Sequence, residues 1–128
     1  MVKSKWKVAS LGGSPDEVEA TLYEAMQTGN IEAFMACWAD EDDVVCVHPG
    51  GPRIVGHQAI RQSFETLFES GSIMAKPEGL RRVSSLTCSV HNLVERVRIE
   101  TPEGPREAVV LATNVYHRTP QGWRLVLH

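Results

Sequence analysis

A histidine stands at the end of an apolar, strand-like segment, where it could exchange a proton with a bound ligand. The segment is Val44-Val45-Cys46-Val47-His48. Because side chains alternate between the two faces of a strand, His48 shares its face with Val44 and Cys46. An imidazole in such surroundings is neutral near pH 7, and it can accept and return the proton that enolisation or elimination requires. The alternative is that His48 has only a structural role at the end of the strand.

Three further polar side chains fall on one face of a predicted C-terminal hairpin. The segment Thr119-Pro120-Gln121-Gly122 predicts a three-residue loop with a bulge. In that register Asn114 faces His128, and Tyr116 faces Val126. Alternation then puts Asn114, Tyr116 and His128 together among small apolar neighbours, which is typical of a small-molecule pocket. In such a pocket the amide of Asn114 could donate a hydrogen bond to a developing enolate oxygen.

The opposite face of the same hairpin is nearly all apolar. If the polar face lines a pocket, this second face would leave a large hydrophobic patch in water. We therefore expect a homodimer in which the two patches cover each other, as symmetric interfaces usually do. The residues predicted on this face are Val109, Leu111, Thr113, Val115, Leu125 and Leu127.

The remaining histidines are weaker candidates for chemistry. His57 opens a predicted helix and is expected to be exposed, His91 falls at a predicted turn, and His117 faces away from Asn114. A metal bound by His48 and His128 would need a third ligand that no spacing supplies, so no metal site is predicted.

Arginines and cysteines also allow two interpretations. Arg53 and Arg96 could each bind an anionic group, Arg96 as part of the substrate site, although a solvated surface arginine is the alternative for both.

Cys37, Cys46 and Cys88 are odd in number and lie in apolar settings, which favours buried free thiols in a reducing compartment. The cytoplasm is therefore the expected location. No glycine-rich phosphate loop is present, so no cofactor is predicted.

Three helices are predicted before residue 71. Ser14-Pro15-Asp16-Glu17 is a helix start, and an apolar stripe follows it as far as Gly29. Asn30 caps a second helix that includes Trp38 and ends at the acidic run 40–43. The third helix spans His57–Ser70. The apolar residues of the first stripe are Val18, Leu22, Ala25 and Met26.

The rest of the chain alternates between strands and turns. Thr101-Pro102-Glu103-Gly104 repeats the chemistry of the later turn, so both segments predict hairpin loops. Helices followed by a strand meander predict an α+β domain in which a helical N-terminal half packs on a curved antiparallel sheet around a pocket. The predicted strands are Val44–His48, Arg53–Val55, Leu80–Val90, Leu93–Glu100, Arg106–Arg118 and Trp123–His128.

Length and composition favour one domain of this kind. The chain has 128 residues, 42% of them hydrophobic, and a formal charge of −3. The charge gives no reason to expect nucleic acid or an anionic membrane as a partner, and no run is long and apolar enough to span a membrane. Residues 1–13 lack the apolar stretch of a signal peptide and are predicted to be a flexible arm. The domain is expected over residues 14–128.

Three segments together carry a resemblance to a known superfamily. They are Gly29-Asn30 with the helix ending in Trp38-Ala39-Asp40, the turn Val47–Pro52 followed by Gly56, and the closing segment Gly122–His128. These segments resemble the nuclear transport factor 2-like superfamily, the cone-shaped, cystatin-like fold of ketosteroid isomerase, scytalone dehydratase and SnoaL-type polyketide cyclases. The resemblance covers about residues 15–128. It implies the fold more than the function, because members include enzymes, transport factors and assembling domains.

The resemblance also implies roles for particular residues. His48 falls where ketosteroid isomerase has its general-base aspartate, and Asn114 falls near the acid that donates to the oxyanion. The isomerase's tyrosine on the first helix falls on Leu22, and Tyr23 is expected to point elsewhere. A true steroid isomerase is therefore not expected.

These observations lead to two hypotheses of different kinds. In the first, the chain binds a small apolar carbonyl compound and is a ketosteroid-isomerase-like isomerase, cyclase or dehydratase without a cofactor. His48 would be its base, Asn114 its oxyanion donor, and Trp38, Tyr116 and His128 would shape the pocket. In the second, it is a non-catalytic ligand-binding or dimerisation domain of the same fold.

Overall fold

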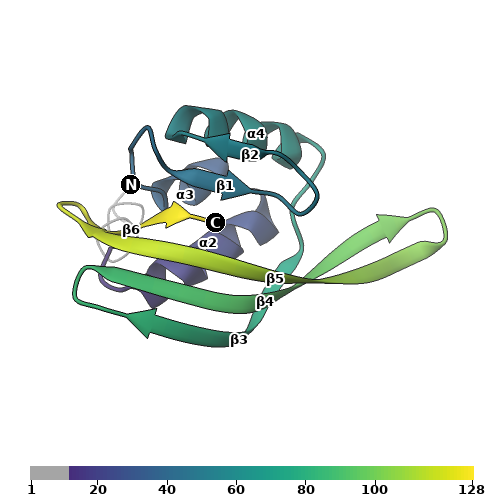
Figure 1. The fold of residues 1–128 in the computed structure, drawn as a ribbon. Coiled ribbons are helices and arrows are strands. Elements are labelled where there is room, and N and C mark those ends of the chain that lie inside the picture. Colours follow the sequence, from purple (N-terminus) through teal and green to yellow (C-terminus); the bar gives the residue numbers. More distant parts are fainter. Residues whose placement is uncertain (1–11) are drawn as a thin grey trace.

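The computed structural model describes residues 12–128. Over these residues, three helices pack on one face of a curved six-stranded sheet, so the predicted α+β fold is confirmed (Figure 1). Most of the predicted N-terminal arm, residues 1–11, lies outside the described residues. At its end, the carbonyl of Gly12 accepts a hydrogen bond from the backbone N–H of Trp123 at 2.9 Å.

Helix α2, Pro15–Thr28, begins and ends where the sequence predicts. The side chain of Ser14 accepts a hydrogen bond from the backbone N–H of Glu17 at 3.2 Å. Gly29 ends the helix in the left-handed conformation, with φ of 66°. The predicted apolar stripe is buried, and it forms the helical side of the core.

Helix α3, Ile31–Ala36, is shorter than predicted. Asn30 caps it as expected, accepting from the backbone N–H of Ala33 at 3.0 Å. Beyond Ala36 the backbone instead bonds to the last strand: the N–H of Leu125 donates to the carbonyl of Cys37 at 2.7 Å, and that of Ala39 donates to Leu125 at 2.9 Å. Trp38 therefore lies beside a strand rather than on the helix.

A short hairpin and a helix follow. Strand β1, Val45–Val47, pairs antiparallel with β2, Arg53–Val55. Helix α4, His57–Glu69, buries Ile60 and Phe64 on its inner face. All three elements agree with the prediction within one or two residues. His48 follows β1 directly.

Strands β3, Ala75–Ser84, and β4, Cys88–Thr101, differ from the prediction. No break occurs near residue 91, because His91 lies within β4 and is fully buried. The connection is residues 85–87. Strand β3 includes Pro77, which an edge strand tolerates, and a register shift between Glu78 and Arg81 accommodates the turn-like segment around Gly79.

The predicted closing meander is confirmed. Strands β4, β5 (Gly104–Thr119) and β6 (Gly122–Leu127) pair antiparallel in order, and both Thr-Pro-x-Gly segments form hairpin connections. The tip of the β4–β5 hairpin extends away from the body of the molecule (Figure 1).

The predicted register of the last hairpin is wrong near the turn. Thr119 pairs with Gly122, so the loop has two residues, and Tyr116 pairs with Leu125 rather than with Val126. A shift next to Tyr116 then leaves Val126 as an extra residue on β6. Leu125 consequently faces inward and is fully buried, which removes it from the outer apolar face where it was predicted.

The sheet is mixed, in the order β2-β1-β6-β5-β4-β3. The contact of β1 with β6, where Val45 pairs with Leu127, is parallel, and the other strand contacts are antiparallel. This parallel contact places His48 beside the end of β6. The N–H of Val47 donates to the carbonyl of His128 at 2.8 Å.

Candidate functional site

A cluster of buried polar side chains lies between helix α2 and the inner face of the sheet. Helix α2 contributes side chains one turn apart, and β4 and β5 contribute alternate residues along each strand. His91, Asn114 and Tyr116 are fully buried, and the two glutamates are nearly so. We call these residues the polar cluster: Glu19, Tyr23, His91, Glu95, Asn114, Tyr116 and His128.

Glu19 receives several hydrogen bonds at one carboxylate oxygen. Its Oε2 accepts from Tyr116 Oη at 2.8 Å and from Asn114 Nδ2 at 3.2 Å. The Nδ1 atom of His91 lies 2.9 Å from the same oxygen. A buried carboxylate is tolerated when donors surround it in this way. Glu19 therefore organises the inner part of the polar cluster.

Tyr23 joins this inner part to a second carboxylate. Its hydroxyl donates to Glu95 Oε2 at 2.5 Å and accepts from Asn114 Nδ2 at 3.1 Å. Burial is the main cause of a raised pKa for Tyr23, and the nearby charge of Glu95 adds to it. Burial and Glu19 likewise raise the pKa of Tyr116. Both phenols therefore stay protonated and act as donors.

Asn114 is fully engaged inside the polar cluster. Its amide group donates to Glu19 and to Tyr23, and its Oδ1 contacts Nδ1 of His128. The predicted juxtaposition of Asn114 with His128 is therefore found. Because both amide hydrogens are already donated, the side chain has none left for an oxyanion, so its observed contacts fit a role in positioning His128.

His48 lies at the solvent-accessible side of the same region. Its ring centroid is 5.1 Å from that of Phe64, and its Nε2 is 3.3 Å from Ser63 Oγ on α4. Burial lowers the pKa of His48 below the usual value, so the ring is neutral near pH 7. The charge of His48 contributes to the pKa of His128, consistent with the closeness of the two segments.

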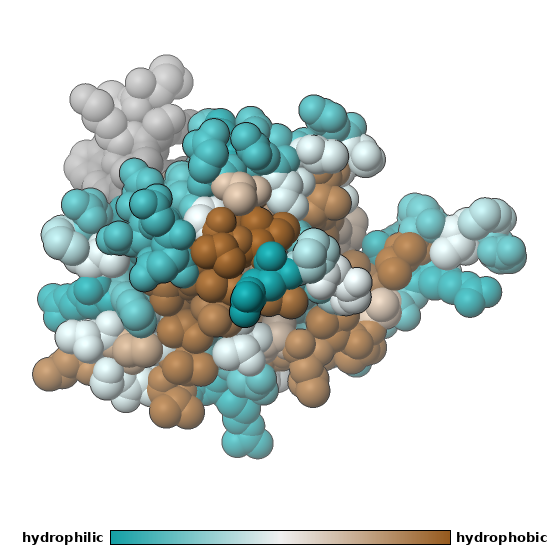
Figure 2. All heavy atoms as spheres, turned by 45° about the horizontal axis from the view of Figure 1, so that its top comes forward, coloured by the Kyte–Doolittle hydropathy of each residue, from teal (hydrophilic) through white to brown (hydrophobic). Residues whose placement is uncertain are grey.

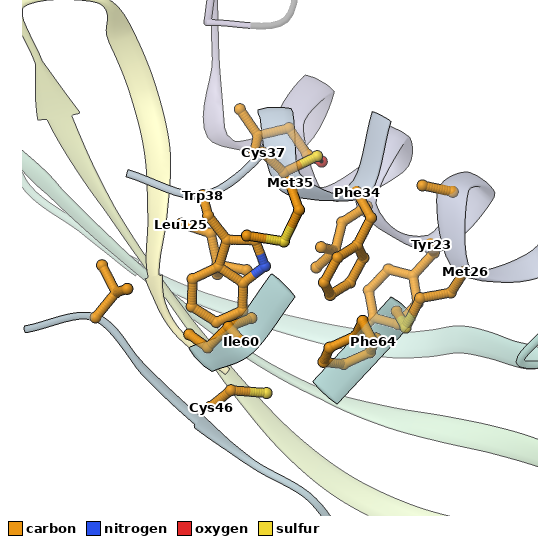
Figure 3. Packing of buried hydrophobic residues seen from close by; sticks show 14 of the residues in the cluster. Tyr23, Met26, Phe34, Met35, Cys37, Trp38, Cys46, Ile60, Phe64 and Leu125 are labelled. Atoms are coloured by element: carbon orange, nitrogen blue, oxygen red, sulfur yellow. Dashed lines mark hydrogen bonds between the residues drawn. The ribbon is translucent and has the colours of Figure 1, made fainter. Parts of the chain in front are cut away.

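Trp38 supplies a buried donor that no described residue accepts. Its side chain packs in the hydrophobic core with Met35, Ile60 and Leu125 around it (Figure 3). Within residues 12–128, the indole Nε1–H has no hydrogen-bond partner. Such a group costs roughly 1–3 kcal/mol when it is left unpaired.

Arg96 is separated from these residues. It lies on the outer face of β4, where its guanidinium donates to Glu78 at 2.5 Å and to Glu107 at 2.9 Å.

Two thiols, those of Cys37 and Cys46, are buried in the core. Their pKa values are raised to about 12, mainly by burial. They are therefore protonated and unreactive near pH 7.

A cavity of about 500 Å³ lies away from the polar cluster, where the α4–β3 connection meets β4. None of its lining residues belongs to that cluster. The cavity is lined by Ser72, Ile73, Met74, Val97, Arg98, Ile99 and Glu100. In the part of the chain that the structure describes, no three His, Cys, Asp or Glu side chains are grouped as a metal site. No helix within residues 12–128 is long and apolar enough to cross a membrane.

Comparison with known proteins agrees with this architecture. The family model described as SnoaL-like domain matches residues 16–128. The chain belongs to the SnoaL-like domain family. No curated protein matches the sequence.

The solved structures similar to this SnoaL-like domain include two that share 25% or more of its sequence. One, from Thiobacillus denitrificans, is provisionally assigned as a calcium/calmodulin-dependent protein kinase type II association domain; it is 29% identical, with 90% of this chain and 91% of that chain covered and a TM-score of 0.78. The other, from Streptomyces avermitilis, is provisionally assigned as a dehydratase of the NTF2-like family; it is 25% identical, with 87% and 88% covered and a TM-score of 0.76.

A more distant structure, the CaMKII hub of S. rosetta, shows the shared fold alone. It is 18% identical, with 87% of this chain and 88% of that chain covered and a TM-score of 0.68. These three structures therefore carry names of two kinds, an enzyme and an association domain.

Four residues of the polar cluster were not predicted from the sequence as site residues. They are Glu19, Tyr23, His91 and Glu95. Tyr23 was expected to point elsewhere, yet it is buried and reaches the sheet. Glu19 interrupts the apolar face of α2, and Glu95 lies on the same strand face as the buried Leu93. For both glutamates, the sequence did contain a signal: a charged residue stands at a position that the apolar pattern places in the core. His91 was hidden by the incorrect turn prediction.

Proposed function

We propose that this SnoaL-like domain binds a small, largely apolar carbonyl compound and transfers a proton on it without a cofactor. His48 is the base in this proposal, and the indole N–H of Trp38 is the donor to the ligand oxygen. The observation that carries the proposal is that a neutral imidazole and an unengaged buried donor belong to one cluster of contacting aromatic rings. Phe34 and Phe64 connect the two residues, with ring centroids 4.1 Å apart.

The proposed chemistry balances without an added reactant. His48 takes a proton from the carbon next to the carbonyl, and the electron pair of that C–H bond moves to form an enolate. Trp38 stabilises the enolate oxygen. Return of the proton to another carbon gives an isomer, whereas its transfer to a β-hydroxyl group, which leaves as water, gives dehydration. Asn114 and Tyr116 support the site from inside the polar cluster.

Deuterium exchange tests this proposal directly. The protein is incubated with cyclohexanone in D₂O, and loss of the α-proton signals is followed by NMR. We expect His48→Ala to reduce exchange by at least about 10²-fold. Trp38→Phe should reduce it by about the same factor, because one donor to the oxyanion is lost. His57→Ala, which removes the histidine at the first residue of α4, is the matched control.

The second candidate is a non-catalytic binding or assembly domain. It is favoured by the relative provisionally assigned as an association domain and by the exposed apolar residues of the sheet. Exchange that is equal in the parent and in His48→Ala would contradict catalysis by His48. A ligand retained by the protein, seen by native mass spectrometry without any exchange, would favour the second candidate.

We further propose a homodimer through the outer face of the sheet. Val109 and Leu111 are 61% and 75% exposed there, and Val83 lies on the same face at 74%. Figure 2, in which the top of Figure 1 with α4 and β2 is turned forward, shows hydrophobic residues gathered in the middle of that side as well. Covering such a patch with a second copy would remove it from water.

The cytoplasm remains the proposed location, since all three cysteines are free.

A further inference from the structure

The orientation of the Asn114 amide follows from its neighbours. The Oε2 atom of Glu19 already accepts the hydroxyl hydrogen of Tyr116, so the Asn114 atom that faces this carboxylate must be its NH₂ group. The amide oxygen must then face Nδ1 of His128. An amide oxygen only accepts hydrogen bonds. His128 therefore carries a hydrogen on Nδ1.

The other ring nitrogen of His128 is left as an acceptor. Burial lowers the pKa of this histidine, and the charge of His48 lowers it further, although Glu95 and Glu19 act in the opposite direction. The ring is therefore neutral near pH 7 and has a single N–H. Since that hydrogen is on Nδ1, Nε2 presents a lone pair.

A second acceptor faces this lone pair. Glu95 Oε2 lies 3.7 Å from His128 Nε2, which is too far for a direct hydrogen bond. The same oxygen accepts the hydroxyl hydrogen of Tyr23 at 2.5 Å, so Tyr23 supplies no hydrogen to the histidine. The two acceptors thus face each other with no hydrogen between them. Their side chains are 13% and 8% exposed for His128 and Glu95, respectively, so the gap borders accessible space.

We propose that Glu95 and His128 form an acceptor pair that selects ligands carrying a hydroxyl group. One O–H directed between the two atoms would donate to both, as a three-centre hydrogen bond. A ligand without a donor would leave both acceptors unpaired and would bind less tightly. The inference rests on the proposed function and narrows its substrate class to hydroxylated carbonyl compounds.

Two NMR measurements test the pair. In the free protein at pH 7.5, the ¹⁵N shifts of the His128 ring should identify Nδ1 as protonated and Nε2 as unprotonated. Titration with 4-hydroxycyclohexanone, whose hydroxyl group is not β to the carbonyl and so cannot leave in the proposed dehydration, and with cyclohexanone is followed by the ring protons of His128. It should give about tenfold tighter binding of the hydroxyketone. That ratio corresponds to one hydrogen bond to a charged acceptor.

Two matched variants assign the preference. Glu95→Gln keeps an acceptor for Tyr23 but can place an N–H against His128, so the preference should fall to about twofold or less. Glu107→Gln changes a carboxylate on the outer face, where it contacts Arg96, and should keep the full preference. A backbone amide spectrum of each variant confirms that it is folded.

The outcomes separate this inference from the proposed function. A proton on Nε2 of the free protein, or equal binding of the two ketones, would overturn the acceptor pair and leave the proposed function standing. Failure of both ketones to shift any resonance would contradict the proposed function and, with it, this inference. A preference that persists in Glu95→Gln would also overturn the assignment to Glu95.

Discussion

The side chains of Asn114 and His128 meet although the two residues are fourteen positions apart in the chain, and their contact sets the tautomer of the histidine. The amide oxygen of Asn114 accepts from Nδ1, while its NH₂ group is held by Glu19 and Tyr23. Positions on two elements, α2 and β5, thus determine the tautomer of one imidazole. Each of these residues therefore acts on the accessible part of the site through His128.

We predict that the protein becomes less stable as the pH falls below about 6.5, the unfolded-state pKa of histidine. The folded-state pKa values of His48 and His128 are both lowered, so the unfolded chain binds more protons than the folded one in this range. Their stabilising contribution is complete above the unfolded pKa and is lost as the pH falls through the folded pKa. The limiting slope for His128 is about 1.4 kcal/mol per pH unit. Urea unfolding at pH 7.5, 6.5 and 5.5 measures it.

His128→Asn should flatten this pH dependence, whereas His117→Asn should not. His117 lies on the exposed side of β5 and serves as the matched control. A free energy of unfolding that rises toward pH 5.5 in the parent would contradict the predicted direction of both pKa shifts.

Local signals in the sequence were sufficient to predict most of the fold. Ser14 and Gly29 bound α2 as their capping preferences require, and the repeated Thr-Pro-x-Gly segments both form hairpins. Strand β3 was predicted to begin at Leu80, although it begins at Ala75, because Pro77 and Gly79 look like turn residues. An edge strand accommodates them with a register shift, which local preferences do not reveal.

The candidate site was harder to predict than the fold. Asn114 and His128 were paired correctly even though the hairpin loop is one residue shorter than predicted, because Val126 adds a residue to β6 and restores the register. Glu19 and Glu95 were missed because their partners lie 72 or more residues away. Such contacts depend on how α2 packs on the sheet, and apolar periodicity indicates only which face is buried.

We predict that Glu19→Gln destabilises the protein by about 1–3 kcal/mol. The substitution keeps the shape of the side chain but replaces a carboxylate oxygen that accepts from Tyr116 and Asn114. An amide N–H placed there would face donors instead of satisfying them. Chemical denaturation followed by tryptophan fluorescence measures the change. Glu24→Gln, at an exposed position of the same helix, should leave stability within about 0.5 kcal/mol, and equal effects of the two would argue against a buried role for Glu19.

We predict that Leu111→Lys produces a monomer while the parent is a dimer. Leu111 is 75% exposed at the centre of the outer apolar face, and burying a lysine charge against a second copy would cost more than the contact returns. Light scattering at about 50 μM, well above the micromolar dissociation constant of a weak dimer, gives the mass. Leu86→Lys, in the β3–β4 connection and 84% exposed, should remain a dimer. A monomeric parent at that concentration would refute the interface.

The two repeated turns allow a matched test of the N-terminal contact. Gly104 and Gly122 occupy equivalent positions, with φ of 108° and 105°, so replacement by alanine strains both backbones alike. Only at Gly122 would the added Cβ also meet another segment, the backbone oxygen of Gly12 at 2.8 Å, whereas nothing lies within 4 Å at Gly104. We therefore expect Gly104→Ala to cost about 1 kcal/mol and Gly122→Ala to cost about 1–3 kcal/mol more, since the two backbones must separate. Urea unfolding of the two variants measures the difference. Equal losses would show that the contact between Gly12 and the last hairpin contributes nothing to stability.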